Sequence, residues 1–129
     1  MKIEHAELSL KDKARLLQAQ KIAATSDRRK KHGCVITKGG RVLGIGVNTA
    51  RNDRSVFETI NHEDRSYHAE EMALKAIGGS ASGAVVYVAR VGYRGKPLMS
   101  KPCDSCMTML IEANVKKIVY TVDSAVSVH

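Results

Sequence analysis

Residues 102–106, PCDSC, place two cysteines three positions apart directly behind a proline. Proline is common at the start of a helix, and side chains three apart lie on the same helix face. Such a pair is compatible with a structural zinc site, a thioredoxin-like redox pair, two buried thiols, or part of a catalytic metal site. The five residues alone do not choose among these interpretations, so the remainder of the chain must.

The segments around this stretch alternate between helix and strand patterns. Residues 103–114 are predicted as a helix with Met107, Leu110 and Ile111 inward, and residues 116–122 as a strand. Upstream, the apolar run 84–89 predicts a strand buried on both faces.

Further upstream, residues 67–77 carry an apolar stripe at helical spacing and are stopped by two glycines. The runs 34–37 and 41–47 are β-rich and separated by KGG, which predicts a hairpin. Residues 48–66 are polar and are predicted as a long functional loop.

Residues 9–29 are predicted as a first helix, with Ser9 as the N-cap and Leu10, Ala14 and Leu17 on one face. The basic run 28–32 falls where this helix is expected to end, and cations there complement the helix dipole. The resulting order, α-β-β-α-β-α-β, predicts one α/β domain over residues 1–129, with a mixed sheet of four to five strands flanked by helices.

The two later helices bring chemistry to their first turns. His68 and Glu70 begin one helix, and Cys103 and Cys106 begin the next. Both helices follow a loop and precede a strand, so we expect their N-termini to meet at one edge of the sheet. One imidazole and two thiolates can hold zinc and leave a fourth tetrahedral position open, with Glu70 beside it as a proton carrier.

HAEE at 68–71 followed by PCDSC at 102–106 resembles the zinc-dependent cytidine/deoxycytidylate deaminase superfamily. The resemblance implies the three-layer cytidine-deaminase-like fold, Zn²⁺ bound by His68, Cys103 and Cys106, and Glu70 as the catalytic proton shuttle. It also implies that Asn48, in GIGVN at 44–48, contacts the sugar or base of the substrate. The backbone N–H of Ala69 and the carbonyl of Lys101 would then contact the pyrimidine edge.

The substrate implied is a cytosine nucleoside or nucleotide (cytidine, deoxycytidine or dCMP), converted to the uracil form with release of ammonia in pyrimidine salvage or supply. One alternative is a polynucleotide-editing deaminase, and another is a non-catalytic zinc-binding module of the same fold. The net charge of +8 suits phosphate, and five basic residues are candidates to bind it: Arg51, Arg54, Arg90, Arg94 and Lys96. With no Trp, one Phe and four Tyr, the chain offers few platforms for stacking the bases of a single strand.

Several further expectations follow from composition and from the family. The N-terminus carries charges and no apolar segment, which predicts a cytoplasmic protein without a membrane span. Cys34 is expected in the core, whereas His32 and His62 are expected to face solvent. The tail after Val122 is too short for a helical crossover, which predicts either a short antiparallel strand over residues 125–129 or a truncated sheet. The family implies a homo-oligomer: a dimer, tetramer or hexamer.

Overall fold

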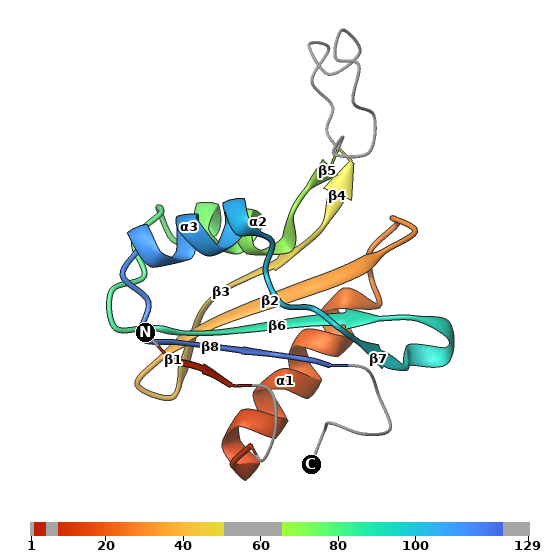
Figure 1. Ribbon diagram of the computed structural model, residues 1–129, viewed down its shortest axis with the longest axis horizontal. Coiled ribbons are helices and arrows are strands. Elements are labelled where there is room, and N and C mark those ends of the chain that lie inside the picture. Colours follow the sequence, from red (N-terminus) through yellow and green to blue (C-terminus); the bar gives the residue numbers. More distant parts are fainter. Residues whose placement is uncertain (1, 5–7, 51–65, 123–129) are drawn as a thin grey trace, which may run out of the picture.

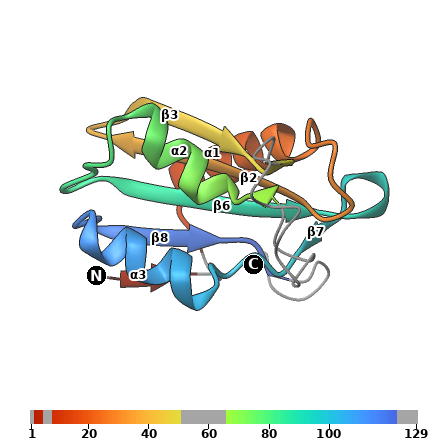
Figure 2. The same cartoon turned by 90° about the horizontal axis from the view of Figure 1, so that it is seen from above.

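The computed structural model describes residues 2–4, 8–50 and 66–122, and these residues form a three-layer α/β/α sandwich (Figures 1 and 2). The main sheet has the order β1-β8-β6-β2-β3, with β7 beside β6. Its strands are β1 (Lys2–Glu4), β2 (Lys31–Lys38), β3 (Arg41–Val47), β6 (Val85–Val91), β7 (Pro97–Leu98) and β8 (Lys117–Tyr120). The predicted layered α/β fold is therefore confirmed.

The sheet is mixed, as expected. β3, β2 and β6 are antiparallel neighbours, whereas β6, β8 and β1 run parallel. A second, two-stranded sheet pairs β4 (Thr49–Ala50) with β5 (Ser66–Tyr67), so short strands occupy both ends of the segment predicted as a loop. A 3₁₀ turn, η2 (Tyr93–Gly95), links β6 to β7.

One helix covers one face of the sheet, and two helices cover the other (Figure 1). α1 (Leu10–Ala23) packs on β2 and β6, while α2 (Ala69–Ala76) packs on β3 and β2. α3 (Asp104–Glu112) lies on the same side as α2, over β8, when the molecule is viewed from above (Figure 2). Within the described residues, no helix is long and apolar enough to cross a membrane.

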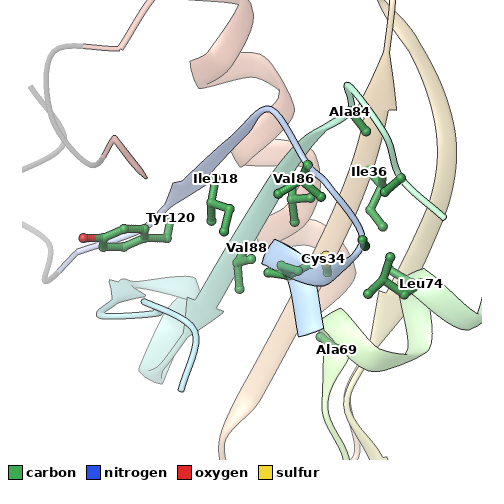
Figure 3. Close-up of a cluster of buried hydrophobic side chains, with 14 of the residues drawn as sticks. Cys34, Ile36, Ala69, Leu74, Ala84, Val86, Val88, Ile118 and Tyr120 are labelled. Atoms are coloured by element: carbon green, nitrogen blue, oxygen red, sulfur yellow. The ribbon is translucent and has the colours of Figure 1, made fainter. Parts of the chain in front are cut away.

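The larger core cluster lies between the sheet and the pair α2 and α3 (Figure 3). Alternate residues of β2 and β6 enter it, including Cys34, Ile36, Val86 and Val88, which are fully buried. Intervening residues such as Val35 and Tyr87 face the smaller cluster under α1. The prediction that residues 84–89 are buried on both faces is confirmed, and so is the core position of Cys34.

The inward face of α1 differs from the prediction. Leu10 and Leu17 are 85% and 50% exposed, and the buried face is instead formed by Asp12, Leu16, Ala19 and Ala23. A small-residue face is required because Gly33 of β2 lies directly beneath the helix. A Cβ at Gly33 would lie 2.3 Å from the Ala19 carbonyl oxygen.

Other boundaries also shift. Ser9 is the N-cap, as predicted, and its Oγ accepts from the Asp12 N–H at 3.1 Å, but α1 ends at Ala23 and not at residue 29. On α3, Leu110 is buried, whereas Ile111 is 53% exposed. The predicted strand at 125–129 lies outside the described residues. The edge beside β8 carries β1, a parallel strand that the sequence analysis did not predict.

β3 and α2 approach as closely as β2 and α1 do. A Cβ added to Gly46 would lie 2.3 Å from the Ala69 carbonyl oxygen and 2.5 Å from the Ala73 nitrogen, both of them backbone atoms. Neither atom can move without shifting the start of α2. Gly46 therefore fixes the height of this helix above the sheet.

We predict that Gly46→Ala lowers the free energy of unfolding by about 3 kcal/mol, because the added methyl group must displace helix backbone. Gly44→Ala is the matched control on the same strand, since its tightest contact, 2.6 Å, is to Cγ2 of the flexible Ile77 side chain. Urea denaturation measures both variants. Equal losses for the two would contradict the role assigned to Gly46.

Candidate metal centre

Two helix N-termini meet at one end of the sheet, as the sequence predicted. His68 is the N-cap residue of α2, and Cys103 is the N-cap residue of α3, both with extended backbone. Cys106 follows in the first turn of α3. Glu71 stabilises the start of α2, because its Oε1 accepts from the His68 N–H at 3.3 Å.

The three predicted ligands converge. His68 Nδ1 lies 3.2 Å from Cys106 Sγ and 3.7 Å from Cys103 Sγ, and all three ligand atoms lie within 4.8 Å of one another. In a tetrahedral zinc site, ligand atoms 2.0–2.3 Å from the metal are roughly 3.5 Å apart. The spacing of one imidazole nitrogen and two sulfurs therefore fits a zinc ion.

The thiol of Cys106 shows how this cluster depends on a cation. Burial, together with the nearby Glu70 and Cys103, raises the pKa of Cys106. A coordinated metal reverses this effect and deprotonates the thiol. Cys34 is the contrasting case, since burial raises its pKa well above the usual range and its thiol is not part of the converging ligand cluster.

Glu70 is the second residue of α2, the helix that His68 caps. Its side chain is almost fully buried, with 4% of the residue surface exposed. Burial raises the pKa of its carboxyl group, although its own backbone N–H and the nearby His68 act to lower it. A buried carboxyl group with a raised pKa can hold a proton as well as release one. The side chain also forms part of the wall of the cavity beside the ligands.

The cavity has a volume of about 590 Å³. The three residues predicted to contact the sugar or base of the substrate lie in its wall: Asn48, Ala69 and Lys101. The wall also contains residues that the sequence analysis did not assign to the site: Arg28, Arg29, Lys30, His32 and Ser100.

The basic run at 28–30 was assigned to the end of the first helix, and this was wrong. The helix ends earlier, at Ala23, and is followed by ATSD at 24–27, where the hydroxyl of Thr25 donates to the Ile22 carbonyl at 2.7 Å. Thr, Ser and Asp favour such local bonds over helix continuation, so this signal was present in the sequence. The cations therefore lie on the rim of the cavity.

Asn48 holds this rim in place. Its Oδ1 accepts from the His32 N–H at 2.9 Å, and its Nδ2 donates to the Lys30 carbonyl. Its own carbonyl accepts from Ser26 Oγ at 2.9 Å. The buried side chain thus ties the segment before β2 to the end of β3, and contact with a substrate remains a prediction.

Other predicted positions fall differently. His32 is half-buried in the cavity wall, which corrects the expectation that it faces solvent. Burial, with Arg90, His68 and Lys30 nearby, lowers its pKa to about 4. Of the basic residues proposed for phosphate, Arg90, Arg94 and Lys96 are outside the described cavity lining. Arg51, Arg54 and His62 lie outside the described residues.

Comparison with known proteins now adds to this geometry. The model of the cytidine and deoxycytidylate deaminase zinc-binding region matches residues 9–122. The chain belongs to this deaminase family. No curated protein sequence matches it significantly.

Solved structures of other proteins share the fold. The dCMP deaminase of cyanophage S-TIM5, in complex with dCMP and dUMP, is 24% identical with a TM-score of 0.66, over 90% of this chain and 85% of that one. RibD of Acinetobacter baumannii is 26% identical with a TM-score of 0.54, over 85% of this chain but only 27% of RibD. The deaminase domain described above is thus similar to whole enzymes and to parts of longer ones.

Membership of a zinc-binding family and the converging ligand atoms agree on the cofactor, which is zinc. The prediction of Zn²⁺ is confirmed, and His68, Cys103 and Cys106 are positioned to hold it. The family also supports hydrolytic deamination as the general chemistry.

We predict that Cys106→Ala reduces bound zinc from one ion per chain to a small fraction and lowers the unfolding temperature, because metal binding is coupled to folding. Cys34→Ala is the matched control, since it removes a buried thiol outside the ligand cluster. Metal analysis of the purified variants measures the zinc content. Full zinc content in Cys106→Ala would show that the ligand set is different.

Proposed function

We propose that this deaminase acts on a cytosine nucleotide bearing a 5′-phosphate and converts it to the uracil form with release of ammonia. The observation that carries the proposal is the rim of Arg28, Arg29 and Lys30 over the cavity that also contains His68, Glu70 and Cys103. A nucleoside would not need these charges, whereas a phosphate gains charge-assisted hydrogen bonds from guanidinium groups. The cyanophage enzyme that shares this fold was solved with dCMP and dUMP.

The proposed mechanism assigns the metal to His68, Cys103 and Cys106. When bound, zinc lowers the pKa of a water molecule toward 7 and so supplies a nucleophile at neutral pH. Glu70 accepts a proton from the attacking water and delivers it to the leaving amino group, so that water and the amine become a carbonyl and ammonia. The backbone N–H of Ala69 and the carbonyl of Lys101 contact the pyrimidine edge.

The surroundings suit these roles. Glu70 is shielded from bulk water, and its raised pKa matches a group that alternates between acid and base. His32 is neutral at pH 7 because its pKa is lowered, so the positive charge at the cavity rim comes from the arginines and lysines. Asn48 orients that rim by its bonds to the backbone of residues 30 and 32.

Glu70→Gln is predicted to lower kcat by about 10²- to 10⁴-fold, because the amide cannot carry the proton. Zinc content should stay at one ion per chain, since Glu70 is not among the converging ligands. Glu71→Gln is the matched control, one position along the same helix, and should keep most of the activity. Loss of zinc from the Glu70 variant would instead make this residue a ligand.

Substrate class is tested with dCMP, CMP, deoxycytidine, cytidine and a cytosine-containing single-stranded oligonucleotide, following ammonia release. We expect turnover of a monophosphate, and we expect Arg28→Gln/Arg29→Gln to lower kcat/KM for it about ten- to a hundredfold. The same double variant should change the low rate with the unphosphorylated nucleoside by less than about threefold.

The control is Lys13→Gln/Lys21→Gln, which removes the same charge from exposed positions of α1. Preference for the free nucleoside would overturn the phosphate assignment, and preference for the oligonucleotide would favour an editing enzyme. A zinc-loaded protein that converts none of the five would support a non-catalytic module.

A further inference from the structure

A second basic cavity lies at the other end of the sheet from the metal centre. The metal-site cavity is lined by residues just before and at the start of β2, whereas this one is lined by Thr37 and Lys38 at its end. Its volume is about 350 Å³. The proposed function does not use it.

The cavity is placed by the strand register. Thr37 pairs with Val85, and Val85 pairs with Lys117, so three neighbouring strands present these residues in one row. The first turn of α1 covers the row. The wall is completed by the glycine turn between β2 and β3, which is bound to α1 because the guanidinium of Arg15 donates to the Gly40 carbonyl at 2.8 Å.

Four lysines line this cavity: Lys11, Lys38, Lys116 and Lys117. The carboxylate of Asp12 also lines the cavity. It accepts hydrogen bonds from Lys117 Nζ at 2.9 Å and from the Tyr87 hydroxyl at 2.7 Å. Both Asp12 and Tyr87 are buried. The negative charge is therefore committed within the fold and does not neutralise the other three lysines.

The three remaining lysines come from different parts of the chain and all line this cavity. Lys11 Nζ lies 3.9 Å from the Cβ position of Gly40, and Lys38 Nζ lies 3.7 Å from that of Gly83. The backbone N–H of Lys116 donates to the Ala84 carbonyl, one residue from Gly83. Among the described residues, none of the three forms an ion pair.

Like charges held together destabilise the compact state and attract a polyanion. A cavity of this volume holds on the order of ten water molecules, which is more than a single phosphate ion displaces. Much of the remaining wall is hydroxyl and glycine backbone, from Ser9, Thr37, Gly39, Gly40 and Gly83, which suits oxygen-rich groups.

We propose that the cavity formed by Lys11, Lys38, Lys116 and the Gly39–Gly40 turn binds an oligophosphate, a group of two or three linked phosphates. The group is either free or part of a nucleoside triphosphate. The three ammonium groups bind its oxygens, while the Asp12–Lys117 pair forms the floor of the site.

The probe is sodium tripolyphosphate, titrated calorimetrically into the zinc-loaded protein at low ionic strength. We expect one binding event that Lys11→Gln/Lys38→Gln weakens about 25-fold, or roughly fivefold for each charge. The matched control Lys13→Gln/Lys21→Gln removes two exposed charges from α1 and should weaken binding less than threefold. Arg28→Gln/Arg29→Gln, at the metal-site cavity, should also bind normally.

Other outcomes are equally decisive. Equal weakening by all three double variants would mean diffuse attraction to a basic protein, and selective weakening by the Arg28/Arg29 variant would place the anion at the metal site; both overturn the proposal. Equally tight binding of citrate would overturn the assignment to phosphate. Zinc content measured after titration excludes metal removal as the source of heat.

Two further arms distinguish the sources of the phosphates. ATP that binds as tightly as tripolyphosphate supports a site that contacts phosphates alone. ATP that binds at least tenfold more tightly, and still depends on Lys11 and Lys38, supports a nucleoside triphosphate. Because Lys11 and Lys38 are remote from the metal ligands, failure of this proposal leaves the proposed deamination unaffected, and the reverse also holds.

Discussion

The contact between Gly46 and the first turn of α2 determines where the metal centre can form. The strand backbone lies against the carbonyl of Ala69, the residue that directly follows His68. Any side chain at this strand position would lift the helix and move the imidazole away from Cys103 and Cys106. The same arrangement recurs on the opposite face, where Gly33 admits α1. The two helices that pack on the hairpin of β2 and β3, α1 and α2, are thus positioned by contact between backbone atoms, which tolerates little movement.

Charged groups gather at both ends of the main sheet, around the metal-site cavity at one end and the lysine-lined cavity at the other. Near the metal centre a buried carboxyl group and two thiols lie close together, and Arg28 and Arg29 line the same cavity. At the other end, the one acidic group among the described residues of the cavity wall, the carboxylate of Asp12, is held by a tyrosine and a lysine. The excess of positive charge in the sequence is therefore gathered, in part, at two separate openings of the described fold.

The order of the main elements and the ligand set could be predicted from sequence because both depend on local signals. The apolar period of 67–77, the KGG turn and the two half-motifs each act over a few residues. The buried face of α1 could not be predicted in the same way, because Gly33, distant in sequence, decides which residues fit beneath the helix. The basic rim was misassigned for a different reason: the predicted helix extended six residues too far, past the local signal in ATSD at 24–27. Strand β1 has only three residues and gains its order from pairing with β8, which no local pattern reveals.

The ligands of the metal centre are separated by the whole of α2, β6 and β7 in the chain. Cys103 and Cys106 are neighbours in sequence, but His68 reaches them only when the sheet between has formed and both helices have docked on one face. The contact between His68 and the cysteines forms slowly during folding, because it joins residues that are far apart in the chain. An unfolded chain holds only the cysteine pair close together, and the complete site belongs only to the finished sandwich. Occupancy by a three-ligand zinc ion is thus a signature of the native topology itself, and it separates correctly assembled molecules from compact ones in which the sheet is incomplete.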